Sequence, residues 1–180
     1  TTLYMSNDYG NTWNKAGVNS TYNWASISCS ADGKKVIAVR SDNGQSYISY
    51  NYGVEWEWIN APTGYLYDVD MSSNGEYIVS TIYTTDSRFW NGIWYLDVNN
   101  PATNNYQGWT RASGANNNLS SLSLSSSGKY GVIFVPGFNG HLQGKGIWIS
   151  SEYGANWTRV LDINSASYHS DVSASVSGRY

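Results

Sequence analysis

The stretch SNDYGNTW, from Ser6 to Trp13, decides how this sequence folds. Its Asp8 can accept hydrogen bonds from backbone N–H groups of its own turn. Gly10 supplies a positive φ, which residues with a side chain adopt only with strain. After Thr12 the chain is expected to be extended, so that the ring of Trp13 can pack under the turn. The stretch therefore predicts a tight turn that joins two β-strands.

Two later stretches repeat this pattern, at residues 49–56 (SYNYGVEW) and 150–157 (SSEYGANW). Asn51 keeps one acceptor oxygen at the Asp position, so its turn is expected to form. Glu152 is longer by one methylene, which puts the shape of the last turn in question. A further copy near Gly108 is degenerate. The defining positions of the two clear repeats are Ser49, Asn51, Gly53 and Trp56, and Ser150, Glu152, Gly154 and Trp157.

A second motif falls between these copies: a strand of small residues followed by a glycine turn. Its glycines recur at a spacing of about 40 to 50 residues, which is typical of the blades of a β-propeller. An Asp-Gly or Asn-Gly pair at such a turn is the usual chemistry of a tight β-hairpin. The turn glycines are Gly33, Gly75, Gly128 and Gly178.

The strands around these turns show two patterns. Ala25, Ile27 and Cys29 alternate with serines, and a period of two indicates a β-strand. The serines favour an innermost strand, where blades converge and large side chains do not fit. Continuous apolar runs at residues 36–39 and 132–135 indicate a second strand that is covered on both faces. We therefore predict an all-β chain, in which Cys29 is a small buried strand residue.

The stretch from Ser6 to Trp13 resembles the Asp box, or BNR repeat, S-x-D-x-G-x-T-W. The resemblance implies β-propeller blades, each a four-stranded antiparallel sheet. Such propellers include sialidases and xyloglucanase-type glycosidases, and also sortilin-type receptors, photosystem assembly factors and lectins. We interpret the box as a structural device of the blade edge, because it recurs once per blade whereas a catalytic site occurs once.

The repeats divide the chain into blades. Residues 23–62, 66–113 and 118–163 are expected to form three whole blades. Residues 1–16 supply only an outer half-blade, and residues 166–180 only an inner half-blade. We expect the chain to be a segment of a larger propeller. The alternatives are a closed four-bladed ring, in which the halves share a blade, and two copies that assemble one ring.

The composition limits the classes of partner. The formal net charge is −3 and 13% of residues are charged, with Lys34 and Lys35 the only adjacent basic pair. A nucleic-acid surface needs clustered basic residues, so no such partner is expected. No apolar run reaches the length of a membrane span. A single cysteine excludes an internal disulfide. No spacing of His, Cys or acidic residues indicates a metal, and no cofactor is expected.

The case for catalysis rests on two carboxylates. Sialidases carry an arginine-isoleucine-proline motif, which this sequence lacks. Xyloglucanase-type enzymes place an Asp near the start of an inner strand, and a glycosidase needs two carboxylates. Asp68 and Asp171 occupy such positions, where other blades have Ser26 and Ser121. We favour the interpretation that both hydrogen-bond neighbouring strands, and we assign no catalytic residue.

The loops at the channel mouth are the candidate binding surface. Aromatic rings stack on sugar faces while polar groups pair with the hydroxyls. We therefore predict a non-catalytic propeller, extracellular or on a particle surface, that binds glycans or protein partners. The alternatives are a piece of a xyloglucanase- or sialidase-like hydrolase and an architectural part of a large extracellular or viral assembly. The candidate ligand-binding residues are Tyr65, Asp86, Arg88, Phe89, Trp90, Phe138 and His141.

Overall fold

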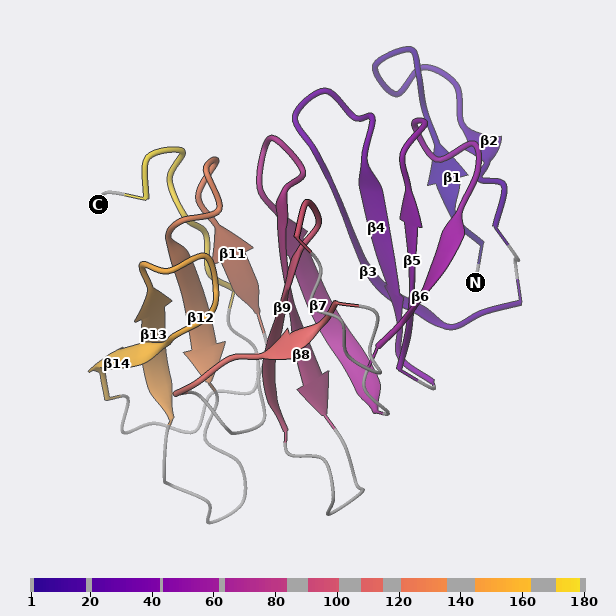
Figure 1. Ribbon diagram of the computed structural model, residues 1–180. Coiled ribbons are helices and arrows are strands. Elements are labelled where there is room, and N and C mark those ends of the chain that lie inside the picture. Colours follow the sequence, from indigo (N-terminus) through magenta and orange to yellow (C-terminus); the bar gives the residue numbers. More distant parts are fainter. Residues whose placement is uncertain are drawn as a thin grey trace.

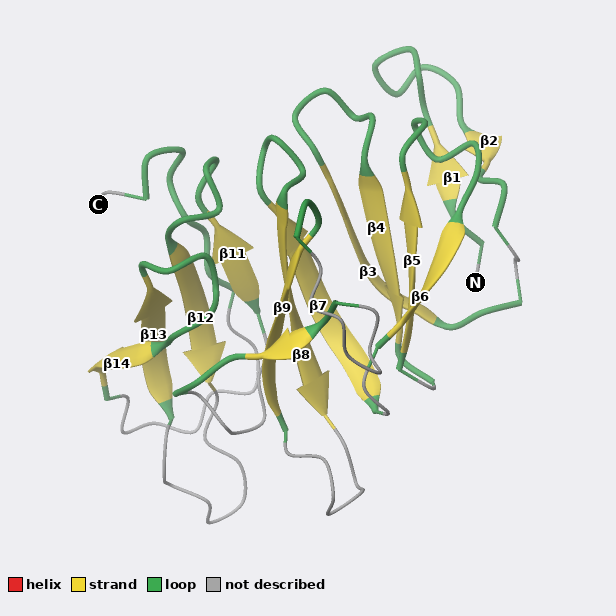
Figure 2. Ribbon diagram, in the orientation of Figure 1, coloured by secondary structure: helices red, strands yellow, loops and turns green. Residues whose placement is uncertain are grey.

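The computed structural model describes residues 2–18, 21–42, 44–61, 64–83, 91–100, 108–114, 121–135, 145–162 and 171–178. All regular structure in these residues is β-strand, which confirms the all-β prediction (Figure 2). Accordingly, the described part of the chain holds no helix that could cross a membrane.

The strands form three four-stranded antiparallel sheets and one two-stranded sheet. Blade 1 is β3 (Trp24–Cys29), β4 (Val36–Arg40), β5 (Gln45–Ser49) and β6 (Glu57–Asn60). Blade 2 is β7 (Tyr65–Met71), β8 (Tyr77–Tyr83), β9 (Gly92–Asp97) and β10 (Thr110–Arg111). Blade 3 is β11 (Leu122–Leu124), β12 (Gly131–Val135), β13 (Gly146–Ser150) and β14 (Thr158–Leu161). Each sheet follows chain order, which is the arrangement expected of a propeller blade.

Two half-blades flank the whole ones. The outer half-blade is the β1 (Tyr4–Met5) and β2 (Asn14–Lys15) hairpin. Residues 171–178 contain no regular strand; we call them the inner half-blade because they lie beside β11, where Ala174 N–H donates to Ser123 Oγ at 3.1 Å. The blades stand side by side in an open arc, with the two termini at opposite sides (Figure 1).

Two apolar layers hold the blades together. Ile37, Val39 and Ile48 of blade 1 pack with Leu66 and Ile78 of blade 2 and are almost completely buried. A second layer joins blades 2 and 3, and its members are Val79, Ile93, Ala112, Leu122, Leu124, Ile133, Val135 and Trp157. The middle strands β4, β8 and β12 are covered on both faces, which explains why their sequences are continuously apolar.

The turn at Ser6 to Trp13 has the internal bonds that its sequence predicts. Asp8 Oδ1 accepts the Thr12 N–H at 2.8 Å, and Asp8 Oδ2 accepts the Thr12 hydroxyl at 2.6 Å. Trp13 Nε1 donates to the Gly10 carbonyl at 3.1 Å. Two residues adopt a positive φ, Tyr9 at 59° and Gly10 at 85°. The sequence predicted the glycine but not the tyrosine.

The two other turns have the same shape despite different acids. We call Ser6–Trp13, Ser49–Trp56 and Ser150–Trp157 the box turns. In the second, Asn51 Oδ1 accepts the Glu55 N–H at 2.8 Å, as Asp8 accepts Thr12. In the third, the Glu152 carboxylate instead accepts the Asn156 side-chain amide. The backbone still turns, with Tyr153 at φ 54° and Gly154 at φ 83°. The question over the third turn is answered: the longer acid changes its bonding and not its shape.

The first strand of blade 1 departs from expectation in two ways. Cys29 is exposed, so the prediction of a buried cysteine is wrong. Ile27, on the same face, is 44% exposed, because no inner strand of the described residues packs there. The register of β3 on β4 also shifts between Trp24 and Ser26, although the side chains of β3 still alternate in burial as predicted.

Candidate functional site

Antiparallel pairing places the glycine hairpin of every blade, and the box turns of blades 1 and 3, at the same end. The other end, which we call the loop end, holds the connections between strands two and three and between blades. It is the channel-mouth surface that the sequence analysis selected. Of the candidate binding residues, Tyr65 is described; Asp86, Arg88, Phe89, Trp90, Phe138 and His141 lie outside the described residues.

Tyr65 belongs to a group of three tyrosines at the loop end of blade 2. Tyr65 and Tyr67 open β7, and Tyr83 closes β8 opposite Tyr65. The rings of Tyr65 and Tyr83 stack with centroids 6.2 Å apart, and that of Tyr67 lies 6.3 Å from Tyr83. Tyr65 is 40% and Tyr67 is 50% exposed. A register shift between Leu66 and Asp68 gives Tyr67 its outward position. We call these residues the tyrosine group.

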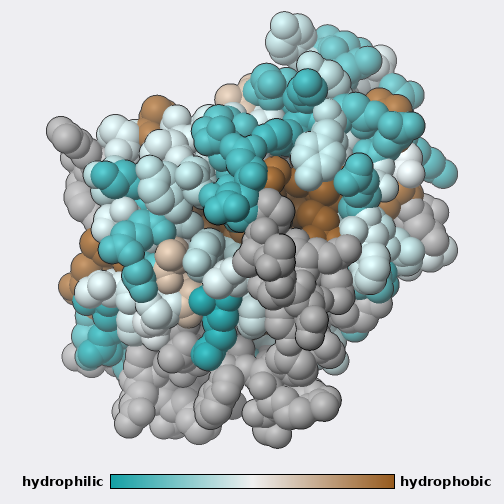
Figure 3. All heavy atoms as spheres, in the orientation of Figure 1, coloured by the Kyte–Doolittle hydropathy of each residue, from teal (hydrophilic) through white to brown (hydrophobic). Residues whose placement is uncertain are grey.

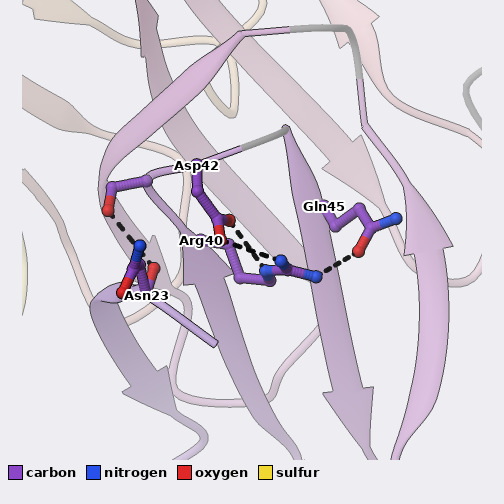
Figure 4. Close-up of polar contacts among 5 residues, drawn as sticks. Asn23, Arg40, Asp42 and Gln45 are labelled. Carbon is purple, nitrogen blue, oxygen red and sulfur yellow. Dashed lines mark hydrogen bonds and ion pairs between the residues drawn. The ribbon is translucent and has the colours of Figure 1, made fainter. Parts of the chain in front are cut away.

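A second cluster at the loop end, in blade 1, is built around Arg40, the last residue of β4. Arg40 Nε and Nη2 each donate to one carboxylate oxygen of Asp42 at 2.9 Å, and Nη1 donates to Gln45 (Figure 4). The guanidinium also lies over the Tyr22 ring, 3.7 Å from its centroid. The rings of Tyr22, Trp24 and Tyr47 pack against one another, with centroids 5.5 to 5.6 Å apart.

The charged groups of this cluster are paired with one another, as in a rigid structural element. Arg40 is only 6% exposed, and its donors are directed to Asp42 and Gln45. Hydrogen bonding and the positive charge of Arg40 hold the pKa of the Asp42 carboxyl below its ordinary value. A bidentate Arg–carboxylate pair of this kind is geometrically specific. The cluster therefore fixes the β4–β5 connection and the aromatic rings beside it.

Two acidic residues line the inner strand of blade 2. Asp68 Oδ1 accepts the Ser26 hydroxyl of blade 1 at 2.9 Å, and Asp68 Oδ2 accepts the Leu122 N–H of blade 3 at 2.9 Å. Asp70 bridges the same strands two residues later, through Ser28 and Leu124, both at 2.8 Å.

Burial raises the pKa of the Asp68 carboxyl, and the hydrogen bonds from Leu122, Ser26 and Val69 oppose that shift. Both oxygens of Asp68 thus join three blades. Asp171, the other acidic candidate, accepts the Ser121 hydroxyl at 2.6 Å on Oδ1. It lies at the edge of the arc, far in sequence from Asp68, and no contact joins the two in the described structure. No group of three or more acidic, His or Cys residues could hold a metal among the described residues.

In the view of Figure 3, hydrophilic residues cover most of the described face, and hydrophobic residues gather in a central hollow and at one edge. A groove of about 180 Å³ lies between the outer strands of blades 1 and 2, lined in part by Ile48, Trp58 and Leu96. It is shallow and belongs to the layer between the blades.

Sequence reasoning missed several residues that the structure brings together. Tyr67, Tyr83 and the Arg40 cluster were not selected, because their partners depend on strand register and on the bulges in β3 and β7. A usable signal was present: aromatic residues stand at the start of the first strand and at the end of the second in the same blade. In an antiparallel hairpin such positions are opposite each other.

Comparison with known proteins supports the fold. No protein-family model matches the chain, and no curated protein is significantly similar to it. Among solved structures, TolB from Acinetobacter baumannii is 14% identical with a TM-score of 0.65, covering 98% of this chain and 41% of TolB. The GH74 enzyme of Niastella koreensis is 16% identical with a TM-score of 0.59, covering 87% of this chain and 26% of the enzyme.

A third similar structure is hydrazine synthase of Kuenenia stuttgartiensis, 13% identical with a TM-score of 0.61, covering 89% of this chain and 46% of that one. This chain therefore spans less than half of each of these proteins. TolB and the GH74 enzymes are β-propeller proteins, so these similarities and the four-stranded blades together show the propeller fold. At these identities the similarity reports the fold alone.

Proposed function

We propose that this propeller segment is a non-catalytic binding module that recognises glycans at its loop end. The tyrosine group is the observation that carries the proposal. Two of its three rings are 40% and 50% exposed, and all three stand on paired strands rather than on a free loop. Exposed rings on a rigid sheet suit the apolar faces of sugars and lose little entropy on binding.

The surroundings supply what sugar recognition needs besides stacking. Tyrosine hydroxyls can donate and accept hydrogen bonds to sugar hydroxyls. The net charge of −3 and the low charged fraction favour a neutral ligand over a polyanionic one. Neutral glycans are found mostly outside cells, and on that ground we propose an extracellular or particle-surface setting.

The hydrolase alternative has weaker geometric support. Glycosidases need two carboxylates that face the scissile bond from either side of a cleft. Asp68 uses both of its oxygens to join neighbouring strands, and Asp171 belongs to a different edge of the arc. A direct check is to incubate the wild-type protein and Asp68→Asn with β-glucan and xyloglucan oligosaccharides. Hydrolysis by the wild type that is lost in the variant would favour the enzyme.

The test of the proposal is glycan-array screening followed by titration calorimetry on any ligand found. Tyr67→Ser is expected to weaken binding at least about fivefold, since stacking on one exposed ring contributes about 1 to 3 kcal/mol by analogy with base stacking. Tyr9→Asn is the matched control, because Tyr9 is fully exposed at the opposite end of the blades. Equal affinity in Tyr67→Ser and Tyr9→Asn, or no ligand on a broad array, would overturn the proposal.

A further inference from the structure

A chain of backbone hydrogen bonds passes from blade to blade through the hairpin turns. The Ala31 N–H of blade 1 donates to the Ser73 carbonyl of blade 2 at 2.8 Å. Ser73 N–H donates to Ser126 of blade 3 at 2.8 Å, and Ser126 N–H donates to Val176 of the inner half-blade at 3.1 Å. These four residues are equivalent, each standing two before its turn glycine. The next bond would run from the Val176 N–H to an Ala31 carbonyl.

The hydrogen bonds of the inner-strand carboxylates also run in one direction from blade to blade. Asp68 accepts a serine hydroxyl from the preceding blade and the Leu122 N–H from the following one. Asp171 is the equivalent residue of the inner half-blade and accepts Ser121 from its preceding blade. Its Oδ2 has no partner among the described residues. The residue equivalent to Leu122 in blade 1 is Ile27, on the strand face that is exposed.

Blade 2 receives the box turn of blade 3 in a defined socket. The ring of Tyr153 packs on Tyr77 with centroids 4.2 Å apart. A Cβ added to Gly154 would lie 2.4 Å from Val79 Cγ2 and 3.4 Å from Tyr95 Cβ, so the glycine is in direct contact with both residues. The socket thus consists of a tyrosine for the box-turn ring and two further side chains for its glycine.

Blade 3 carries the same socket, and no box turn of the described residues fills it. Its equivalent residues are Tyr130, Val132 and Ile149, placed like Tyr77, Val79 and Tyr95 by the turn glycines and by strand pairing. They line a groove of about 380 Å³ beside the inner half-blade, with Ala174 and Gly178 on its other wall.

The outer half-blade offers the matching turn. Tyr9 is fully exposed, and Gly10 has only Trp13 of its own turn within contact distance. The same hairpin packs against the box turn of blade 1, just as blade 2 packs against the box turn of blade 3. Met5 packs against Gly53, as Tyr95 packs against Gly154.

We propose that, in the 180-residue polypeptide, the blade 3 socket binds the Tyr9–Gly10 turn of a second copy, head to tail. The inner half-blade of one copy and the outer half-blade of the next would then form one blade between them. The two ends lie at opposite sides of the arc, so the turn and socket of a single copy do not meet in this structure (Figure 1). This inference is independent of glycan binding.

Three contacts are expected at the junction. Tyr9 of one copy stacks on Tyr130 of its neighbour. The Val176 N–H donates to the Ala31 carbonyl, and Asp171 Oδ2 accepts the Ile27 N–H. Each repeats a contact that already joins blades within the chain. The junction also covers Cys29, which is exposed in one copy and lies on the same strand as Ile27.

The experiment measures the molar mass of the 180-residue polypeptide by sedimentation velocity at increasing concentration. The wild type is expected to associate, and its reaction with a thiol reagent at Cys29 to slow as it does so. Tyr9→Asn and Ile149→Asp should each remain at the mass of one chain. Asn tolerates the positive φ of Tyr9, whose exposed ring makes no folding contact. Tyr67→Asn, on blade 2 and flanked by blades of the same copy, should associate like the wild type.

Mixing the two variants gives the decisive result. Ile149→Asp keeps a working turn and Tyr9→Asn keeps a working socket, so an equimolar mixture should form dimers and stop there. A wild type of single-chain mass at every concentration overturns the proposal, whether Cys29 is reactive or is protected by closure of one chain on itself. Association that survives Tyr9→Asn also overturns it. If Ile149→Asp is unfolded by near-ultraviolet circular dichroism, Tyr130→Ser replaces it in the mixture.

Discussion

Replacing Asp70 with Asn tests whether the inner-strand carboxylates hold the blades together. Asp70 Oδ1 accepts the Ser28 hydroxyl and the Met71 N–H, and Oδ2 accepts the Leu124 N–H, all at 2.8 Å. An Asn side chain has the same size but only one acceptor oxygen. If that oxygen still accepts the hydrogen bonds from Ser28 and Met71, the Leu124 N–H faces an amide NH₂ group and loses its partner.

The expected cost follows from these three bonds. A buried N–H left without an acceptor costs about 1 to 3 kcal/mol. The two remaining bonds change from charged to neutral acceptors, which halves their strength and adds about 1 kcal/mol together. Asp70→Asn is therefore expected to lower the free energy of unfolding by about 2 to 4 kcal/mol. That is a large share of the stability of a small domain.

Urea unfolding followed by tryptophan fluorescence measures this change, provided the urea dependence of the free energy is the same in both proteins. Asp97→Asn is the matched control. Asp97 Oδ1 accepts the Asn99 and Asn100 N–H groups at 3.0 and 3.1 Å in an exposed turn, and an amide oxygen can replace it. A cost below about 0.5 kcal/mol is expected there.

A double-mutant cycle with Ser28→Ala localises the effect. Ser28 belongs to a different blade from Asp70, so a coupling of about 1 kcal/mol would show that the carboxylate acts across the interface. The reasoning is refuted if Asp70→Asn costs no more than Asp97→Asn. A full cost without coupling to Ser28 would instead place the energy within blade 2 and its bond to Leu124.

Two further outcomes are expected. Gly154→Ala should destabilise the fold by about 2 kcal/mol or more, because Gly154 has φ 83° and a Cβ would lie 2.4 Å from Val79. Gly10 has φ 85°, and a Cβ there would meet only Trp13, at 3.9 Å. Gly10→Ala should therefore cost only the backbone strain of about 1 kcal/mol in the same urea assay. Arg40→Lys should cost about 1 to 2 kcal/mol at neutral pH, through loss of the bidentate contact with Asp42. Because Arg40 lowers the pKa of Asp42, this stabilisation exists above the unfolded pKa of about 4 and is lost as pH falls through the folded value. The difference in urea midpoint between wild type and Arg40→Lys should therefore shrink in acid; a constant difference would contradict the ion-pair explanation.

The blades could be predicted from sequence because their signals are local. A glycine turn such as Gly75, and an apolar run such as residues 36–39, fix a hairpin and a covered strand from a few neighbouring residues. The positive φ of Gly10 was predicted on the same basis. That of Tyr9 was not, since a tyrosine adopts this conformation only where the hydrogen bonds of the turn outweigh the strain.

The site was harder to predict because its contacts are not local. Asp68 meets Ser26 and Leu122, which are 42 and 54 residues away, and both bonds depend on the order of the blades in space. Cys29 was expected to be buried because its strand pattern is that of an inner strand. The pattern was read correctly, but the strand that would cover that face is not beside it in the arc.

The direction of the contacts between blades decides what kind of partner can cover the open ends. Each blade offers N–H groups to the next through its hairpin turn, so one end of the arc presents the Ala31 carbonyl and the other the Val176 N–H. Two copies that met through identical ends would bring carbonyl against carbonyl, or one Asp171 carboxylate against another. Only unlike ends are complementary, and such heterologous contacts either close into rings or continue into filaments. A ring leaves no exposed inner strand. If the rotation between copies closes, sedimentation should therefore resolve one discrete oligomer; if it does not, the mass should keep growing with concentration.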